Sequence, residues 1–492
     1  MRREIFRMER VTYKEKEIVF LEDFNIQIYQ GEIMGMLMMN SHGLSAFLQL
    51  LQTNMPLYDG FVYYGGEIIN SWKGSEKLQN RISIIGAENR LVEGLSVSDN
   101  IFVLRQGFRQ ELIRTELLNR QLTPFLEDIG MNISVEAKVE NLTVFERVVV
   151  ELLRAVVMGH HLIVLNEVGA LISHNELKKL HEILRHYAEK GFAFLYVGVH
   201  FEEIAMICDR CAMLSNGRIQ KVIRKDEMAD ETIAVYPAEY DRMVRYYQKK
   251  RKADEMQAEE LMMFHQITGE HLKNVTFRVY EGECLAVQIL NNSAFQELSD
   301  FILGDVKISQ GEIRMDGECI HLPKNRQIAV IRELATKTMI FPELDYMENL
   351  CISLLQRVPN LWRKKGIRSS IRKEYGSFLG EEVFELSMEE LSEKQKYQMI
   401  YTRILLQKPK VVFCIHPFKG ADLPMRMFVW KMMEMLLNHG IAVVILSLNL
   451  SDSLSIADRL VIIGKEGQLE MKREDFAHVP GNVPWTHIYK NE

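Results

Sequence analysis

The chain has 492 residues, of which 26% are charged and 47% are hydrophobic, a composition typical of a folded globular protein. This length predicts two to four domains. The 60 Lys and Arg stand against 67 Asp and Glu, and the net charge of −7 excludes the strongly basic balance of many nucleic-acid-binding proteins. We therefore expect no nucleic-acid partner.

Three features of the sequence bear on the cellular compartment of the protein. No stretch approaches the roughly 18 consecutive apolar residues that a membrane-spanning helix needs. The first residues lack the apolar core of a secretory signal. Six cysteines are too few for a disulfide framework in a chain of this length, and they suit a reducing compartment. The sequence predicts a cytoplasmic protein.

The first half of the chain changes from strand-like to helical patterns. Residues 4–36 carry short alternating runs separated by turns, and residues 105–160 have helical periodicity. Residues 162–165 and 192–197 are continuous apolar runs, which are typical of buried parallel strands. Residues 174–189 between them predict an amphipathic crossover helix. These elements predict an α/β module with an antiparallel N-terminal sheet and a helical insert.

The second half of the chain repeats the first. Residues of the same type recur at separations of 249–251 positions, a range too narrow for chance. The matched residues are Gly31-Glu32 and Gly282-Glu283, Gly60 and Gly311, Leu95…Asn100 and Leu344…Asn349, Arg154 and Arg403, and Asp209-Arg210 and Asp458-Arg459. The sequence predicts two modules, residues 1–248 and 259–492, joined by a polar linker at 249–258.

The order of short motifs resembles an ATP-binding cassette (ABC) ATPase. The motifs are Gly31-Glu32-Ile33 before a phosphate loop, Leu95-Ser96-Val97-Ser98-Asp99-Asn100-Ile101, Asp209-Arg210 and Asn216-Gly217-Arg218. A tandem pair of this length is similar to the ATP-binding subunit of bacterial carbohydrate importers of the ribose, galactose and xylose type. The resemblance covers essentially the whole chain. It implies an α/β fold of two P-loop NTPase-like modules, each with a mixed or parallel core sheet, an antiparallel sheet and a helical subdomain.

The phosphate loop of the first module departs from the family pattern. The pattern G-x-x-x-x-G-K-[ST] wraps phosphates with backbone N–H groups, neutralises charge with Lys and holds Mg²⁺ with Ser or Thr. Residues 38–45 read Met-Met-Asn-Ser-His-Gly-Leu-Ser, so Met38 replaces the first glycine and Leu44 the lysine. Loss of one charge-assisted contact weakens binding by about one to two orders of magnitude. Asn40, Gly43 and Ser45 remain candidate nucleotide ligands, and Ser45 is the candidate Mg²⁺ ligand.

Other positions of the first module are also changed. The Q-loop glutamine falls on Ala87, and the switch histidine falls on Val199, one residue before His200. Asn166 replaces the acidic residue that orders Mg²⁺, and Glu167 occupies the position of the catalytic base. Because the other catalytic positions have changed, Glu167 is better interpreted as a strand-end carboxylate than as a working base.

The remaining cofactor candidate of the first module is an aromatic residue. Tyr13 matches the family's adenine-stacking aromatic. It is equally interpretable as an aromatic on a strand face.

The second module has lost more of the pattern. Its phosphate loop has neither glycine nor lysine, and Ile415-His416 replaces the acidic pair. The resemblance implies composite sites, in which one module's loop meets the other module's signature. Site one pairs Gly43 and Ser45 with Ser392, and we expect it to bind ATP and Mg²⁺ weakly. Site two faces Leu142-Thr143, and we expect no nucleotide there.

Three functions compete at this stage. The first is a non-hydrolysing pseudo-ATPase that binds the permease subunits of a sugar importer or a regulatory protein, with a homodimer left open. The second is an energy-coupling subunit of a carbohydrate transporter with weak residual ATPase activity. The third is a soluble ribosome-associated tandem ABC protein, which the short linker and net charge of −7 disfavour. The resemblance implies a peripheral position at the inner face of the cell membrane for the first two.

Overall fold

The computed structural model describes residues 3–74, 80–87, 90–103, 115–228, 259–322, 325–356, 365–448, 450, 453–464 and 467–479. The chain divides into two compact units, Met1–Ala238 and Glu239–Glu492, called unit 1 and unit 2 below. The predicted linker 249–258 lies outside the described residues. The predicted boundaries of the two modules therefore stay a prediction.

Unit 1 contains two sheets. The antiparallel sheet has the strand order β2-β1-β4-β5, and the central sheet has the order β10-β9-β3-β8-β7-β6, parallel except for β10. The strands are β1 (Glu4–Glu15), β2 (Ile18–Tyr29), β3 (Ile33–Met38), β4 (Asp59–Tyr64), β5 (Glu67–Ser71), β6 (Ile82–Ile85), β7 (Leu162–Asn166), β8 (Ala193–Gly198), β9 (Arg210–Ser215) and β10 (Arg218–Arg224). The predicted antiparallel sheet and buried parallel strands are confirmed.

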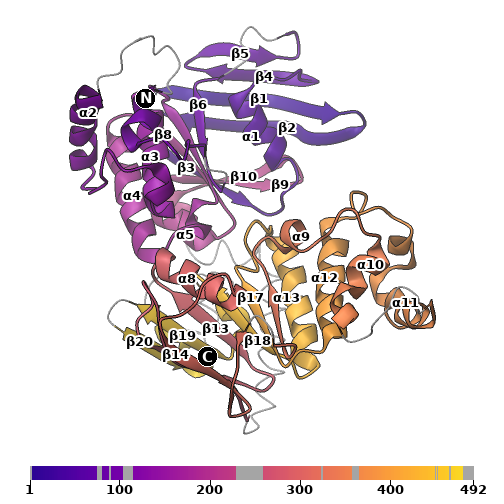
Figure 1. Cartoon of the computed structure of the whole chain (residues 1–492). Coiled ribbons are helices and arrows are strands. Elements are labelled where there is room, and N and C mark those ends of the chain that lie inside the picture. The colour runs from indigo at the N-terminus through magenta and orange to yellow at the C-terminus, as the bar shows by residue number, and fades with distance from the viewer. Residues whose placement is uncertain are drawn as a thin grey trace. The chain divides into compact units, whose positions relative to one another are not determined.

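Two apolar layers enclose the central sheet of unit 1. One layer joins it to the antiparallel sheet and helix α1, and the other joins it to helices α3, α4 and α5 (Figure 1). The helices are α1 (Leu44–Gln52), α2 (Thr115–Asp128), α3 (Val144–Val157), α4 (His174–Glu189) and α5 (Phe201–Ile207), with a short π-helix at Asp99–Val103. Because both faces are covered, β7 and β8 consist almost wholly of buried apolar residues. The capping box of Ser173 and Glu176 starts α4 where the sequence predicts it.

Unit 2 repeats this arrangement. Its antiparallel sheet has the order β12-β11-β14-β15, and its central sheet has the equivalent order β20-β19-β13-β18-β17-β16. The strands are β11 (Glu260–Thr268), β12 (Val275–Tyr280), β13 (Cys284–Ile289), β14 (Gln310–Met315), β15 (Glu318–Cys319), β16 (Ile328–Ile331), β17 (Val411–Ile415), β18 (Ala442–Ser447), β19 (Arg459–Gly464) and β20 (Gly467–Lys472). The helices are α8 (Asn292–Leu303), α9 (Ala335–Thr338), α10 (Tyr346–Cys351), α11 (Lys365–Leu379), α12 (Glu393–Gln407), α13 (Leu423–Asn438) and α14 (Ser453–Ile456). The predicted repeat is confirmed at the level of strand order.

A buried ion pair joins the two sheets of unit 1. Glu32, whose side chain is 0% exposed, accepts hydrogen bonds from Arg210 at 2.6 and 3.0 Å and from the Tyr29 backbone at 2.8 Å. Arg210 also donates to the carbonyl of Gln27 in β2. Burial disfavours the charged guanidinium, but the hydrogen bond and charge of Glu32 outweigh burial and raise the pKa of Arg210.

The same ion pair recurs in unit 2. Arg459 donates to Glu283 at 2.8 Å and to the carbonyl of Arg278 in β12, and Glu283 accepts from the backbone N–H of Tyr280. The preceding aspartates also correspond, because Asp209 and Asp458 accept from the first residues of β3 and β13 at 3.0 and 2.8 Å. The Gly-Glu and Asp-Arg pairs that reveal the repeat are therefore contact partners.

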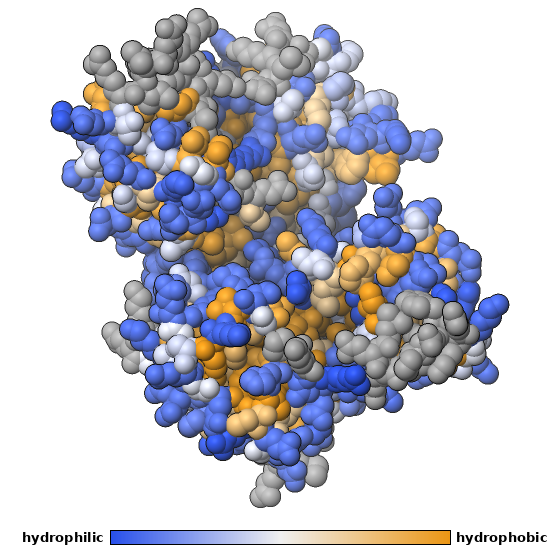
Figure 2. Space-filling view, viewed as in Figure 1, coloured by the Kyte–Doolittle hydropathy of each residue, from blue (hydrophilic) through white to orange (hydrophobic). Residues whose placement is uncertain are grey.

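The surface is mixed in polarity. Figure 2 shows hydrophilic residues over most of the visible face, with hydrophobic residues in separate patches. Among the described residues, no helix has the length and apolar character needed to cross a membrane.

We expect Glu32→Ala to lower the free energy of unfolding of unit 1 by about 3–5 kcal/mol, because it leaves the Arg210 charge without its partner. Denaturant unfolding of the whole chain, followed by hydrogen exchange of the β3 and β9 amides, measures the change. The matched control is Glu22→Ala, which removes an exposed ion pair with Arg218 and should change stability little. Equal effects of the two substitutions would contradict the assigned role of the buried pair.

Candidate nucleotide sites

The loop between β3 and α1 is the predicted phosphate loop of unit 1. Met38, at the position of the first glycine, ends β3 with its side chain buried in the core. Gly43 has a φ of +83°, and a Cβ there would lie 2.4 Å from the carbonyl oxygen of Phe20. Glycine is therefore required at this turn for packing within unit 1 as well as for any ligand.

The polar side chains of this loop contact the protein itself. Asn40 donates to the side chains of Asn216 and Ser215, at 3.0 and 3.3 Å, and accepts from the backbone N–H groups of Asn216 and His42. The His42 ring stacks on Phe20 with centroids 5.9 Å apart and lies 2.9 Å from the carbonyl oxygen of Val19. The loop is thus tied to β2 and to the β9–β10 turn.

Helix α1 starts at the position of the missing lysine. Leu44 is 9% exposed and packs in the core beside the antiparallel sheet, whereas Ser45 is exposed. The N-cap residue Gly43 has no side chain that could cap the first turn, and the Leu44 N–H donates to the Ser41 carbonyl at 3.2 Å. The next N–H groups of α1 and the Ser45 hydroxyl are hydrogen-bond donors of the kind that phosphate oxygens accept from.

Asn166 and Glu167 follow the buried part of β7. The Asn166 Oδ1 atom is buried and has no hydrogen-bond partner among the described residues, and its side chain lies against Gly86, next to the exposed Ala87. Glu167 has a φ of +53°, and its N–H donates to the Val197 carbonyl at 2.9 Å. A left-handed conformation at a non-glycine residue is a strained arrangement that recurs at functional sites.

The other predicted positions of unit 1 lie largely in its interior. Tyr13 is 6% exposed, its ring packs near Phe20, and its hydroxyl donates to Glu15 at 2.5 Å. Burial and the bond to Glu15 raise the pKa of Tyr13 to about 12. These contacts are those of a strand-face aromatic, and adenine stacking by Tyr13 stays a prediction. Val199 packs against the core, and His200 is the N-cap residue of α5.

The equivalent loop of unit 2 is filled by side chains. Asn291 caps α8, because its side chain accepts from the Ala294 N–H at 2.9 Å. Phe295 stands at the lysine position, is 5% exposed, and lies against His416 with ring centroids 4.3 Å apart. Burial, with a smaller contribution from Lys419, lowers the pKa of His416 to about 3, so the ring is neutral at physiological pH. His416 takes the same left-handed conformation as Glu167, with a φ of +44°.

Other polar side chains near α8 and β17 are also paired within unit 2. The Glu297 carboxylate accepts from the backbone N–H groups of Glu270, His271 and Leu272, at 2.6, 2.7 and 2.9 Å. Burial opposes ionisation, but these hydrogen bonds outweigh it and lower the pKa of Glu297. Lys419 forms an ion pair with Glu333. Leu448, at the switch position, lies in the core.

The two signature helices are capped by their own side chains. Thr143 and Glu146 form a capping box at α3, and Ser392 and Gln395 form one at α12. The Ser392 hydroxyl donates to Gln395 Oε1 at 2.8 Å. Glu393 accepts from Thr336 at 2.6 Å and from Lys396 at 3.1 Å. These caps satisfy first-turn N–H groups that would otherwise be available to an anion.

Import ATP-binding proteins of several bacteria match this chain over nearly its whole length. The family described as ABC transporter matches residues 21–170. A xylose import ATP-binding protein of Moorella thermoacetica is 24% identical over 96% of each chain. A ribose import ATP-binding protein of Caldanaerobacter subterraneus is 24% identical over 96% of this chain and 97% of its own. A galactose/methyl galactoside import ATP-binding protein of Fusobacterium nucleatum is 24% identical over 93% of each chain.

The chain is a tandem ATP-binding cassette protein. Members of this family normally bind ATP with Mg²⁺. The two cassettes differ in how well they fit that ligand. Unit 1 offers an α1 terminus without a side-chain cap, the exposed Ser45 hydroxyl and the unpartnered Asn166 oxygen, but no cation at the lysine position. The unit 2 loop does not fit a nucleotide, because Asn291 and Phe295 occupy the helix terminus and the lysine position.

Both cassettes keep an asparagine that organises the segment after the Q-loop position. Asn100 donates to the carbonyls of Val92, Leu95 and Ser96 and accepts from the Val92 N–H. Asn349 makes the four equivalent bonds in unit 2, which involve Phe341, Leu344 and Asp345. The repeated Leu…Asn motif is therefore explained by backbone hydrogen bonds within each cassette.

Sequence reasoning missed the contacts that fill unit 2. The ring contact between Phe295 and His416 and the capping of α8 by Asn291 were not predicted. An Asn three residues before an apolar helical run is an N-cap signal that could have predicted the second contact. The contact between Phe295 and His416 joins residues 121 positions apart, and no local pattern indicates it.

We expect Phe295→Lys to lower the free energy of unfolding of unit 2 by at least about 3 kcal/mol, because it removes a buried ring and buries an ammonium group. Hydrogen exchange of the β13 and β18 amides in denaturant measures the change. The control is Gln296→Lys at the next, exposed position, where the side chain bonds to Asp300 and a lysine is tolerated. A stable Phe295→Lys protein that ATP stabilises further would show that this position faces an open phosphate site.

Proposed function

We propose that this tandem cassette protein does not hydrolyse ATP and acts by binding a protein partner, either a sugar-importer permease or a regulatory protein. The proposal rests mainly on one observation. At the phosphate-loop lysine position of both units, the side chain is apolar and buried, as Leu44 and Phe295. A buried apolar residue there cannot neutralise the charge that develops on a transferred phosphoryl group.

The acidic residues needed for Mg²⁺ chemistry are also missing. Asn166 is neutral and Ile415 has no ligand atom, so neither cassette has a carboxylate at the position that orders the metal. Glu167 remains at the base position of unit 1, but no cation in the phosphate loop accompanies it. His416 at the equivalent position of unit 2 is half-buried and lies against Phe295.

A weak nucleotide site remains in unit 1. Phosphate oxygens would accept from the first N–H groups of α1, and Ser45 would be the Mg²⁺ ligand. Ser392, Asn40 and Tyr13 are additional candidates from the resemblance. Because no lysine contributes, we expect binding in the millimolar range and little preference for ATP over ADP.

The similar proteins support the proposal that the partner is the permease of a sugar importer. Their names assign them to the import of xylose, ribose and galactose, and the chain aligns with nearly their whole length. We therefore propose a carbohydrate-importer permease as the first partner to test, with the protein positioned at the cytoplasmic face of the membrane.

We expect millimolar ATP with Mg²⁺ to raise the melting temperature of the purified chain by a small, saturable amount, through binding to the native state. Ser45→Ala should abolish the shift. The matched control is Gln296→Ala at the equivalent position of unit 2, which should leave the shift unchanged. Micromolar affinity for ATP, or a shift that survives Ser45→Ala, would contradict the proposed weak site.

A further inference from the structure

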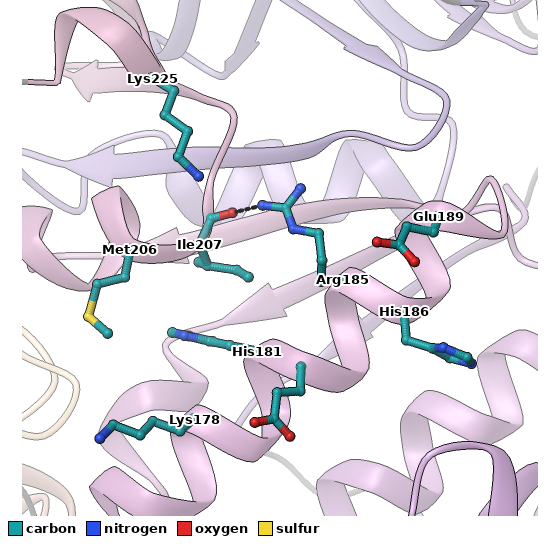
Figure 3. A pocket seen from close by; sticks show the side chains of 9 residues that line it. Lys178, His181, Arg185, His186, Glu189, Met206, Ile207 and Lys225 are labelled. Atoms are coloured by element: carbon teal, nitrogen blue, oxygen red, sulfur yellow. Dashed lines mark hydrogen bonds between the residues drawn. The ribbon is translucent and has the colours of Figure 1, made fainter.

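A hollow of about 630 Å³ lies on unit 1, on the outer side of α4, and belongs to neither phosphate loop. It is lined by residues of α4, by Met206 and Ile207 of α5, and by Lys225 after β10 (Figure 3). The α4 residues from Lys178 to Glu189 extend over ~16 Å at 1.5 Å per residue. The hollow is open rather than enclosed.

Two cations in this hollow have no ion-pair partner among the described side chains. These are Lys178 and Lys225, one at each margin of the hollow (Figure 3). Several other basic groups close by are paired, whereas Arg224, which directly precedes Lys225, adds a further exposed positive charge. The paired groups are Lys179 with Glu182, Arg185 with Asp209, His186 and Lys190 with Asp128, and Arg210 with Glu32. The hollow therefore offers two uncommitted ammonium groups on a chain whose net charge is −7.

The surface between the two lysines is partly apolar. Met206 is 38% exposed and lies beside Ile207 and the His181 ring, whereas Glu189 and His186 lie at the other end of the hollow (Figure 3). Methionine adapts its shape to an apolar partner, which suits a docking surface. The arrangement is an apolar centre flanked by positive charge.

We propose that this hollow binds an acidic segment of a partner protein that carries an apolar side chain between its carboxylates. The apolar side chain contacts Met206, and the carboxylates face Lys178 and Lys225. A small-molecule pocket encloses most of its ligand, whereas this hollow is open along α4. Charge complementarity around an apolar contact is typical of a transient protein interface.

This inference rests on the proposed partner-binding function, but it is tested separately from ATP turnover. If the peptide described below binds and the protein hydrolyses ATP, the proposed function fails and the docking surface stands. If the peptide does not bind and the protein is inactive, only the docking surface fails.

The test is fluorescence anisotropy with a labelled peptide, acetyl-Asp-Glu-Asp-Leu-Leu-Glu-Asp-Glu, and the full-length chain. We expect saturable binding that weakens with added salt and is lost when Asn and Gln replace the acidic residues of the peptide. The double variant K178E/K225E should bind about fivefold more weakly or worse. Met206→Gln should also weaken binding.

The matched control is K16E/K221E, which makes the same charge change at exposed lysines of unit 1 outside the hollow. It should bind like the unmodified chain, and thermal melts should show that all variants fold. The proposal is overturned by equal loss in both double variants, by equal binding of the neutral peptide, or by no binding. Displacement of the peptide by 10 mM inorganic phosphate at constant ionic strength would also overturn it, in favour of a small-anion site.

Discussion

A buried carboxylate–guanidinium pair connects the two layers of each cassette. Glu32 directly precedes β3 of the central sheet, and Arg210 reaches from β9 to the carbonyl of Gln27 in the antiparallel sheet. Glu283 and Arg459 repeat these contacts in unit 2. Removing one partner from such a pair is costly, because the other charge stays buried. The orientation of the antiparallel sheet, and with it the loop before α1 or α8, therefore depends on this interaction.

The residues that the two cassettes share are mostly residues that hold the fold. Asn100 and Asn349 bond to backbone carbonyls, and Asp209 and Asp458 bond to the first N–H of a central strand. Most of the positions that would contact phosphate or Mg²⁺ have changed instead, and several now carry core residues, although Gly43 and Ser45 are retained. Leu44 and Phe295 illustrate this, since each packs in the layer beside an antiparallel sheet. The proposed role, a stable scaffold that does not hydrolyse ATP, would account for both observations.

Much of the fold could be predicted from the sequence because its signals are local or repeated. The apolar runs at β7 and β8, the crossover helix α4 and the repeat separation all have short-range patterns. The side-chain contacts at the two phosphate loops join residues that are far apart in the sequence. His42 stacks on Phe20, and the Phe295 ring lies tilted against His416; the fold alone brings these side chains together. The inward direction of Met38 likewise depends on strand register, which a motif alignment does not specify.

The central claim is that neither cassette supports ATP hydrolysis. Phosphate release by the purified chain with saturating ATP and Mg²⁺ tests it most directly, with Glu167→Gln as the matched variant. We predict that the two proteins release phosphate at the same rate, equal to the rate without protein. Turnover by the unmodified chain that Glu167→Gln abolishes would contradict the account, because it would show a working base beside a phosphate loop that lacks its lysine.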